Sequence, residues 1–360
     1  MLFAPGPVLT SERVKKAALN PDLCHRSKMF EELYKNLRLK LNRLFNANDN
    51  YISIVVSGSG TASNETVLSS VFEENESLLL VSNGEFGNRL KEIAECYGVK
   101  TNIVGFDWGK YPDISRIENV LKKDKSIKLI SMVYHETSTG MINPVHEVGK
   151  LAKKYNKLYH VDAISAIGGE NVDVIRDQID FCTGVPNKSV SGHPGVSFVC
   201  VSKKAFNEVK DVKGRNVYLN LQRHIKLAEE KNQTPNTPSV VMFLVLKEAL
   251  EELFEEGIEN RINRYKEDAT IIRAQIREFD LKLLIEDEDI MSNTVTSVFL
   301  PEKISVYDFV NKMYEKGYVI YLGKGPLLER NMFQIANMGQ IYPEDCRKFN
   351  EVFREVYMSF

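Results

Sequence analysis

The chain has 360 residues and a mass of 41.0 kDa, with 43% hydrophobic and 27% charged residues and a formal net charge of −2. This composition is typical of a globular protein of two domains, and the charge balance excludes the basic excess of a nucleic-acid-binding protein. No apolar run approaches the roughly 18–20 residues that cross a bilayer, and the first residues do not resemble a secretory signal. We therefore expect neither a membrane span nor a signal peptide.

The cysteines are odd in number, scattered and without a CxxC pair. Free thiols in a reducing, cytoplasmic environment are the expectation from such a pattern. The five are Cys24, Cys96, Cys182, Cys200 and Cys346.

From residue 50 onward, short apolar runs alternate with amphipathic stretches. Strands of five or six residues separated by helices predict a mostly parallel, doubly wound sheet. Asp113 suits the start of the third of these helices, and Gly98 suits the end of the second. The predicted strands are 51–56, 77–81, 99–104, 128–133, 157–161, 180–185 and 196–201.

The pattern changes after about residue 235, where two long helices are predicted with Gly257 as the break between them. The later elements predict a smaller α+β domain. We therefore divide the chain into an N-terminal arm with a large domain, 1–255, and a small domain, 256–360. The predicted elements are helices 238–256, 258–279 and 305–317, strands 295–300, 318–322 and 332–336, and a last helix from about 343.

The sequence SGSGTASNE at 57–65 is a glycine-rich turn that follows a strand and opens a helix. Glycines permit a tight turn, and free N–H groups at a helix N-terminus attract phosphate. The motif is neither a Walker A nor a full GxGxxG, so a nucleotide site is weakly supported. A small-residue turn that allows close helix–strand packing explains the motif equally well when it is taken alone.

Asp162 comes at the C-terminal end of an apolar strand in HVDAISAIGG (160–169). Open α/β sheets bind ligands at this edge, and a carboxylate there needs a partner. A helix cap is the structural interpretation. A protonated pyridine nitrogen is the functional one, because the carboxylate would keep such a ring an effective electron sink.

Lys188 lies in GVPNKSVSGHPGVSF (184–198), a turn between two apolar strands. A lysine among small residues can be desolvated and lose its proton more easily, as an imine-forming amine must. A single loop lysine is more often solvated, but this one follows the phosphate turn and the acid in chain order. His135, His160 and His193 share no metal-ligand spacing, so no metal site is expected.

These motifs together resemble the class V aminotransferases of the aspartate-aminotransferase fold, most closely the 2-aminoethylphosphonate–pyruvate transaminases. The similarity is carried nearly end to end by FAPGPVLTSERVKKA, SGSGTASNETVLSS, LLVSNGEFGNRL, MVYHETSTGMINPVHEVGKLAKKY, HVDAISAIGG, NKSVSGHPGVSFV, GYVIYLGK and NMGQIYPED. The resemblance implies a pyridoxal-phosphate-dependent transferase of fold type I.

The resemblance also implies residue roles. Lys188 would bind the cofactor covalently and move the substrate proton, and Asp162 would pair with the pyridinium nitrogen. Thr234 matches a threonine that reaches the phosphate of the neighbouring subunit, which implies a homodimer with shared active sites. The implied cofactor contacts are Ser59, Gly60 and Thr61 at the phosphate, Asn187 beside it, Phe86 stacked on the ring and Thr137 at the ring hydroxyl. As plain structural residues, Phe86 would be core and Thr137 a turn hydroxyl.

Two positions depart from the family. Gln334 stands in FQIAN (333–337) where the family carries an arginine that holds the substrate's acidic group. A neutral amide replaces a bidentate, charge-assisted contact, so another cation is needed: Arg26, Lys324 or Arg330. Val185 and Pro186 precede the lysine where small hydroxyl residues are common, so one phosphate contact is expected to be missing.

The function that the resemblance implies is transamination of 2-aminoethylphosphonate and pyruvate to phosphonoacetaldehyde and alanine, or the reverse. The glutamine leaves three alternatives. One is a class V aminotransferase of the alanine or serine–glyoxylate type. The second is a lyase or decarboxylase that uses the same cofactor, and the third is a non-catalytic binding protein.

Overall fold

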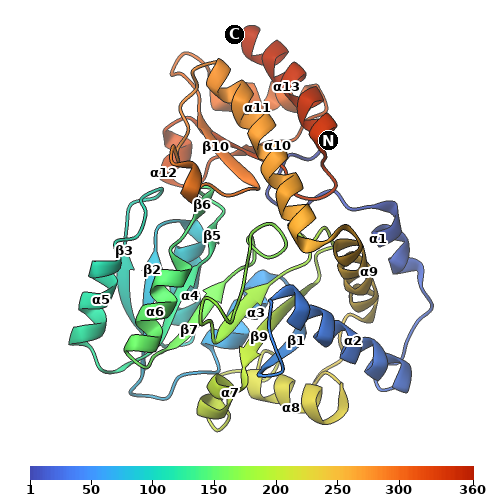
Figure 1. The fold of residues 1–360 in the computed structure, drawn as a ribbon, viewed down its shortest axis with the longest axis vertical. Helices are drawn as coiled ribbons and strands as arrows, with labels where there is room; N and C mark the ends of the chain where they lie inside the picture. Colours follow the sequence, from blue (N-terminus) through green and yellow to red (C-terminus); the bar gives the residue numbers. More distant parts are fainter.

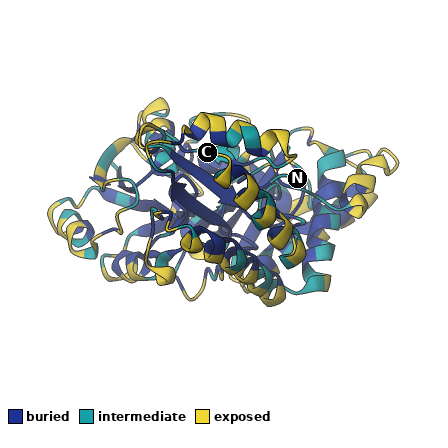
Figure 2. Ribbon diagram, turned by 90° about the horizontal axis from the view of Figure 1, so that it is seen from above, coloured by how far each residue is buried: buried dark blue, intermediate teal, exposed yellow.

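The computed structural model describes all 360 residues, and Figure 1 shows a large domain with a smaller one beside it. The large hydrophobic core contains 66 buried residues and the small one 22. The strands of the interior are the most buried part of the chain, and the exposed positions lie on the outer helices and loops (Figure 2). No helix is both long enough and apolar enough to span a membrane.

The large domain is built on a seven-stranded sheet of order β1-β9-β8-β7-β4-β2-β3. Strand β9 runs opposite to the other six strands, which all point the same way. The predicted mostly parallel sheet is therefore confirmed. All seven predicted strands are present: β1 (Tyr51–Ser57), β2 (Ser77–Ser82), β3 (Lys100–Gly105), β4 (Ile127–Val133), β7 (Leu158–Asp162), β8 (Phe181–Gly184) and β9 (Val196–Ser202).

Helices surround this sheet, and the helix start predicted at Asp113 and the helix end predicted at Gly98 are both confirmed. The Asp113 carboxylate accepts the Ser115 N–H at 2.8 Å and caps the third predicted helix, and Gly98 follows the second at φ +63°. The helices are α3 (Gly60–Leu68), α4 (Glu85–Cys96), α5 (Ile114–Lys123), α6 (Val145–Lys154), α7 (Lys203–Val209), α8 (Leu221–Lys231) and α9 (Val240–Glu256). A small hairpin of β5 (His135–Glu136) and β6 (Met141–Ile142) follows β4.

Residues 1–50 contain helices that the sequence analysis did not predict. The longest, α2, buries one face of Phe30, Leu33, Leu37 and Leu41 against the large core. The arm comprises α1 (Glu12–Lys16), η1 (Ala17–Leu19) and α2 (Lys28–Leu44).

In the small domain, α10, α11 and α12 contact the three-stranded antiparallel sheet β10-β12-β11, and α13 packs on α10 and α11. The long helix α10 begins directly after Gly257, at the predicted break, and runs from the large domain into the small one (Figure 1). The elements are α10 (Ile258–Glu278), η2 (Glu288–Ile290), β10 (Val295–Phe299), α11 (Val306–Glu315), β11 (Tyr321–Leu322), α12 (Pro326–Glu329), β12 (Met332–Ala336) and α13 (Pro343–Met358).

One predicted strand is wrong in most of its length. Of residues 318–322, only Tyr321 and Leu322 pair with β12. Val319 instead bonds to the first residues of the chain: its N–H donates to Met1 at 2.9 Å and its carbonyl accepts the Phe3 N–H at 2.9 Å. A partner more than 300 residues away is invisible to a local hydrophobic pattern.

Candidate active site

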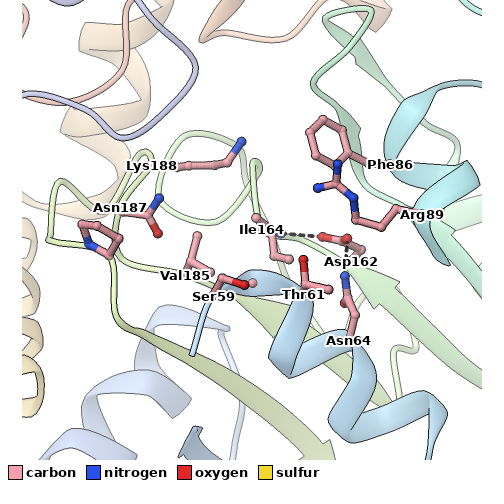
Figure 3. Close-up of a pocket in the computed structure, with 12 residues that line it drawn as sticks. Ser59, Thr61, Asn64, Phe86, Arg89, Asp162, Ile164, Val185, Asn187 and Lys188 are labelled. Carbon is pink, nitrogen blue, oxygen red and sulfur yellow. Dashed lines mark hydrogen bonds between the residues drawn. The ribbon is translucent and has the colours of Figure 1, made fainter. Parts of the chain in front are cut away.

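The predicted phosphate turn, acid and lysine meet at the carboxyl ends of the parallel strands. They line one cavity of about 210 Å³ (Figure 3). Its lining residues are Ser59, Gly60, Thr61, Asn64, Phe86, Arg89, Asp162, Ile164, Val185, Asn187, Lys188 and Pro194.

The turn after β1 places Ser59, Gly60 and Thr61 at the start of α3. Ser59 is the N-cap, but its side chain makes no capping hydrogen bond, so the first N–H groups of the helix are left for another acceptor. A Cβ on Gly60 would lie 2.6 Å from Ile164 Cδ1 and 3.0 Å from Val185 Cγ1, so glycine leaves room for these two side chains at the turn. The cavity floor can therefore receive an anionic group.

Asp162 ends β7 and is 5% exposed. Its Oδ1 accepts the Ile164 N–H at 3.0 Å, and its Oδ2 accepts the Asn64 side-chain amide at 2.7 Å. The Thr183 hydroxyl in turn donates to Asn64 Oδ1 at 2.7 Å, which fixes the amide orientation. Burial raises the pKa of Asp162 while these two bonds and the nearby Lys188 lower it.

Lys188 follows β8 and points into the same cavity (Figure 3). Burial of its amine lowers the pKa of Lys188 from 10.5 to about 8, and the opposing charge of Asp162 acts against this shift. The amine lies 5.4 Å from the centroid of the Phe86 ring. A lysine poised in this way is neutral in a useful fraction of molecules near neutral pH.

A second compartment of about 200 Å³ adjoins the first and shares Phe86, Arg89, Asn187 and Lys188 with it. It is closed on one side by the N-terminal segment, where Gly6 is so near that a Cβ there would lie 3.3 Å from Lys188 Cγ. Its other lining residues are Pro5, Gly6, Thr137, Ser138, Tyr321, Lys324 and Gln334. A substrate in this compartment would lie against the lysine.

Most of the predicted site residues therefore lie in the two compartments, and three do not. The Arg26 guanidinium bonds to Gln233 Oε1 at 2.8 Å and to the Thr234 carbonyl at 2.9 Å, outside both. The Thr234 hydroxyl donates to the Asn236 carbonyl at 2.8 Å. Arg330 is exposed, with its guanidinium 4.6 Å from the Phe299 ring centroid.

Thr137 lines the second compartment, and its hydroxyl is hydrogen-bonded to Ser165. Val185 lines the first, so an apolar side chain does stand next to the asparagine and lysine of the turn. All five cysteines are free.

Three further residues that line or support the two compartments were not predicted from the sequence. Asn64 is one helical turn beyond Gly60 in the same motif, and Arg89 follows Phe86 by three residues on α4, so helical spacing carried a signal for both. The third is Glu136, whose buried carboxylate accepts the N–H groups of Phe86 at 3.3 Å and Gly87 at 3.1 Å. It thereby holds the start of α4, which carries Phe86 and Arg89.

Comparison with known proteins gives consistent results. The family model described as aminotransferase class V matches residues 10–328. A bifunctional phosphonoacetaldehyde hydrolase/aminoethylphosphonate transaminase of Clostridioides difficile is 33% identical over 360 residues, which are 99% of this chain and 56% of that protein. The chain thus spans only about half the length of that relative.

A 2-aminoethylphosphonate–pyruvate transaminase of Salmonella schwarzengrund is 33% identical over 354 residues, which are 96% of this chain and 94% of that protein. Among solved structures, a ureidoglycine–glyoxylate aminotransferase of Bacillus subtilis superposes with a TM-score of 0.90 at 26% identity, covering 99% of this chain and 92% of the other.

Proposed function

Since the chain belongs to the class V aminotransferase family, whose members use pyridoxal phosphate, we propose that it transfers an amino group between 2-aminoethylphosphonate and pyruvate. The observation that carries the proposal is the meeting of Ser59, Asp162 and Lys188 in one cavity. The substrate pair comes from the relatives of 31–33% identity that bear this activity in their names.

The residues of the cavity suit pyridoxal phosphate. The uncapped start of α3 with Ser59, Gly60 and Thr61 would hold the phosphate, and Asn187 lies at the same cavity. Asp162, fixed by two donors, would pair with the ring nitrogen, and Phe86 would stack on the ring. Lys188 would form the covalent link, since its amine has a lowered pKa and faces the same space.

When bound, pyridoxal phosphate supplies the aldehyde that takes up the amino group and the ring that stabilises the electron pair left on the substrate carbon. Lys188 Nζ would serve as the base that holds and moves the proton of the substrate carbon, since it lies in the same cavity. The Asp162 carboxylate would accept a hydrogen bond from the protonated ring nitrogen and so favour that protonated form. Pro5, Gly6 and Tyr321 form walls that limit water around the lysine.

The proposal includes a homodimer with shared active sites. Thr234 and Arg26 are hydrogen-bonded to each other outside this protomer's cavity, which supports their serving the site of a partner. Leu19, Met29 and Leu39 are exposed on the neighbouring helices, at 83%, 68% and 60%, as a face buried by a second copy would require. We place the domain boundary at 255/256 and the protein in the cytoplasm.

The test offers the cofactor-loaded protein one amino donor at a time and follows the visible absorbance of the cofactor. We expect 2-aminoethylphosphonate and alanine to convert it to the aminated form, and pyruvate to restore it. Serine, aspartate and glutamate should act weakly. Conversion by other donors alone would refute the substrate assignment, and release of product without conversion would indicate a lyase.

A further inference from the structure

Gln334 is unable to bind an acidic group in the arrangement found. It is 1% exposed, and its amide nitrogen donates to the Thr137 carbonyl at 2.8 Å and to Ser297 Oγ at 2.9 Å. Both amide hydrogens are thus used, which leaves only the carbonyl oxygen, an acceptor that repels anions. The side chain ties β12 to the hairpin after β4 instead.

The cations of the second compartment are Lys188, Arg89 and Lys324. Besides Lys188, the Arg89 guanidinium lies 5.0 Å from the Phe86 ring centroid and the Lys324 ammonium 4.9 Å from it, and Arg89 also lines the first cavity. In Figure 3, Arg89 extends beside the Phe86 ring on the side of the cavity opposite Lys188.

Neither cation forms a close ion pair with a carboxylate. The single ion pair of Arg89 is to Glu85, at 3.5 Å on the same helix, and Lys324 has no carboxylate within 4.0 Å. Burial and the charge of Arg89 lower the pKa of Lys324, against the opposing charges of Glu85 and Glu136. Two neighbouring cations around an open compartment favour an anion that contacts both.

We propose that Arg89 and Lys324 together hold the acidic group of the substrate and select a dianion. The inference rests on the proposed function for the identity of the substrate. A guanidinium fork binds two oxygens in a plane and an ammonium binds a third, so a phosphonate dianion engages both groups. A sulfonate has the same shape with one charge less, and therefore gains less from the pair.

The experiment measures binding of ethylphosphonate, which has no amino group to react, to the cofactor-loaded protein by calorimetry. Arg89→Gln and Lys324→Gln should each weaken binding by about 10- to 100-fold, the loss of one charge-assisted contact. Arg89→Lys should recover part of the affinity. Arg330→Gln, which removes an exposed arginine outside the compartment, is the matched control and should bind as the unmodified protein does.

Ethanesulfonate should bind the unmodified protein at least about tenfold more weakly than ethylphosphonate. Unchanged ethylphosphonate affinity in both glutamine variants would overturn the proposal, as would equal affinity for the two anions. The absorbance of the cofactor shows whether Arg89→Gln still binds it. If this variant loses cofactor but its loaded sites bind ethylphosphonate normally, Arg89 serves the cofactor, and the proposal is overturned as well. Turnover of 2-aminoethylphosphonate by the unmodified protein decides the proposed function separately, because ethylphosphonate binding requires no reaction.

Discussion

At the scale of single residues, the site depends on two buried ionisable groups whose surroundings oppose their charge. Burial lowers the pKa of Lys188 to about 8 and raises the pKa of Asp162, while the donors that Asn64 and Ile164 direct at Asp162 act against that rise. Lys188 and Asp162 could be predicted because their residue types and order carry the chemistry. The donors to Asp162 could not be predicted with the same force, because an asparagine on a helix has no distinctive pattern.

Replacing Lys188 with methionine should stabilise the cofactor-free protein at pH 7. The folded pKa of about 8 lies below the unfolded value of 10.5 because burial disfavours the charged amine, and at pH 7 most folded molecules still carry that charge. Keeping this charge buried lowers the free energy of unfolding by at most about 3 kcal/mol. The full loss applies below pH 8, and it disappears as the pH rises to 10.5. The unfolding temperature of the variant should therefore exceed that of the unmodified protein at pH 7 and converge with it near pH 10.5. Lys226→Met, at an exposed position, should show no such convergence.

Asn64→Ala should weaken cofactor binding through Asp162. The variant removes the donor to Oδ2 and leaves the Thr183 hydroxyl without its acceptor, so the pKa of Asp162 rises further. We expect cofactor affinity about tenfold lower at neutral pH, from the loss of one hydrogen bond to a charged group, and a steeper decline on acidification. Fluorescence titration of the cofactor across pH checks this. Thr183→Ser keeps the hydroxyl and should behave normally, whereas equal pH profiles for Asn64→Ala and the unmodified protein would contradict the role.

At the scale of elements, the strands were predictable because each is a short run of apolar residues between polar stretches. Strands β2 and β9 are buried throughout, while the edge strand β3 has exposed positions. The arm helix α2 and the pairing of Val319 were missed for different reasons. The amphipathic pattern of α2 lies in a polar segment before the alternation begins, and Val319 depends on a partner far along the chain. Local hydrophobic patterns were thus enough to predict the strands of the sheet. The segments that border the site depend on long-range contacts, which such patterns do not show.

The start of α4 depends on Glu136, so Glu136→Gln should disturb Phe86 and Arg89 together. The carboxylate accepts N–H groups at both oxygens, and a glutamine would turn its NH₂ toward one of those donors. We expect the unfolding temperature to fall, with a cost of about 1–3 kcal/mol for the unsatisfied donor, together with weaker cofactor and anion binding. Glu92→Gln, exposed on the same helix, is the control. If Glu136→Gln is stable and binds both the cofactor and the anion normally, the position of α4 does not depend on Glu136.

At the scale of the whole molecule, the two domains are joined by hydrogen bonds beside the site. Both oxygens of Glu170 accept from Asn293, the backbone N–H and the side-chain amide each at 2.7 Å. The Ser292 N–H adds a bond to the Gly140 carbonyl at 2.9 Å. Burial raises the pKa of Glu170 to about 8, so its charge changes within the range of ordinary buffers.

Asn293→Asp should destabilise the protein more at pH 9 than at pH 6. Because the pKa of Glu170 is raised, the folded protein binds a proton that the unfolded chain releases, so the free energy of unfolding falls as the pH rises toward 8. A second carboxylate opposite Glu170 repels the charge that then forms, which makes this fall steeper. Asn293→Ala removes the side-chain donor without adding charge, so its loss should depend less on pH. Unfolding temperatures of the three proteins at the two pH values provide the measurement. A pH-independent difference between Asn293→Asp and Asn293→Ala would contradict this account.

The N-terminal segment has a consequence for the order in which the protein is completed. Leu2 pairs with Val319, Leu9 pairs with Gly339, and Gly6 between them forms a wall beside Lys188. This segment therefore waits for residues that are synthesised more than 300 positions later before the wall can close. A nascent chain that already contains the complete seven-stranded sheet would still have an open site, so competence for substrate should appear only after Gly339 has been synthesised.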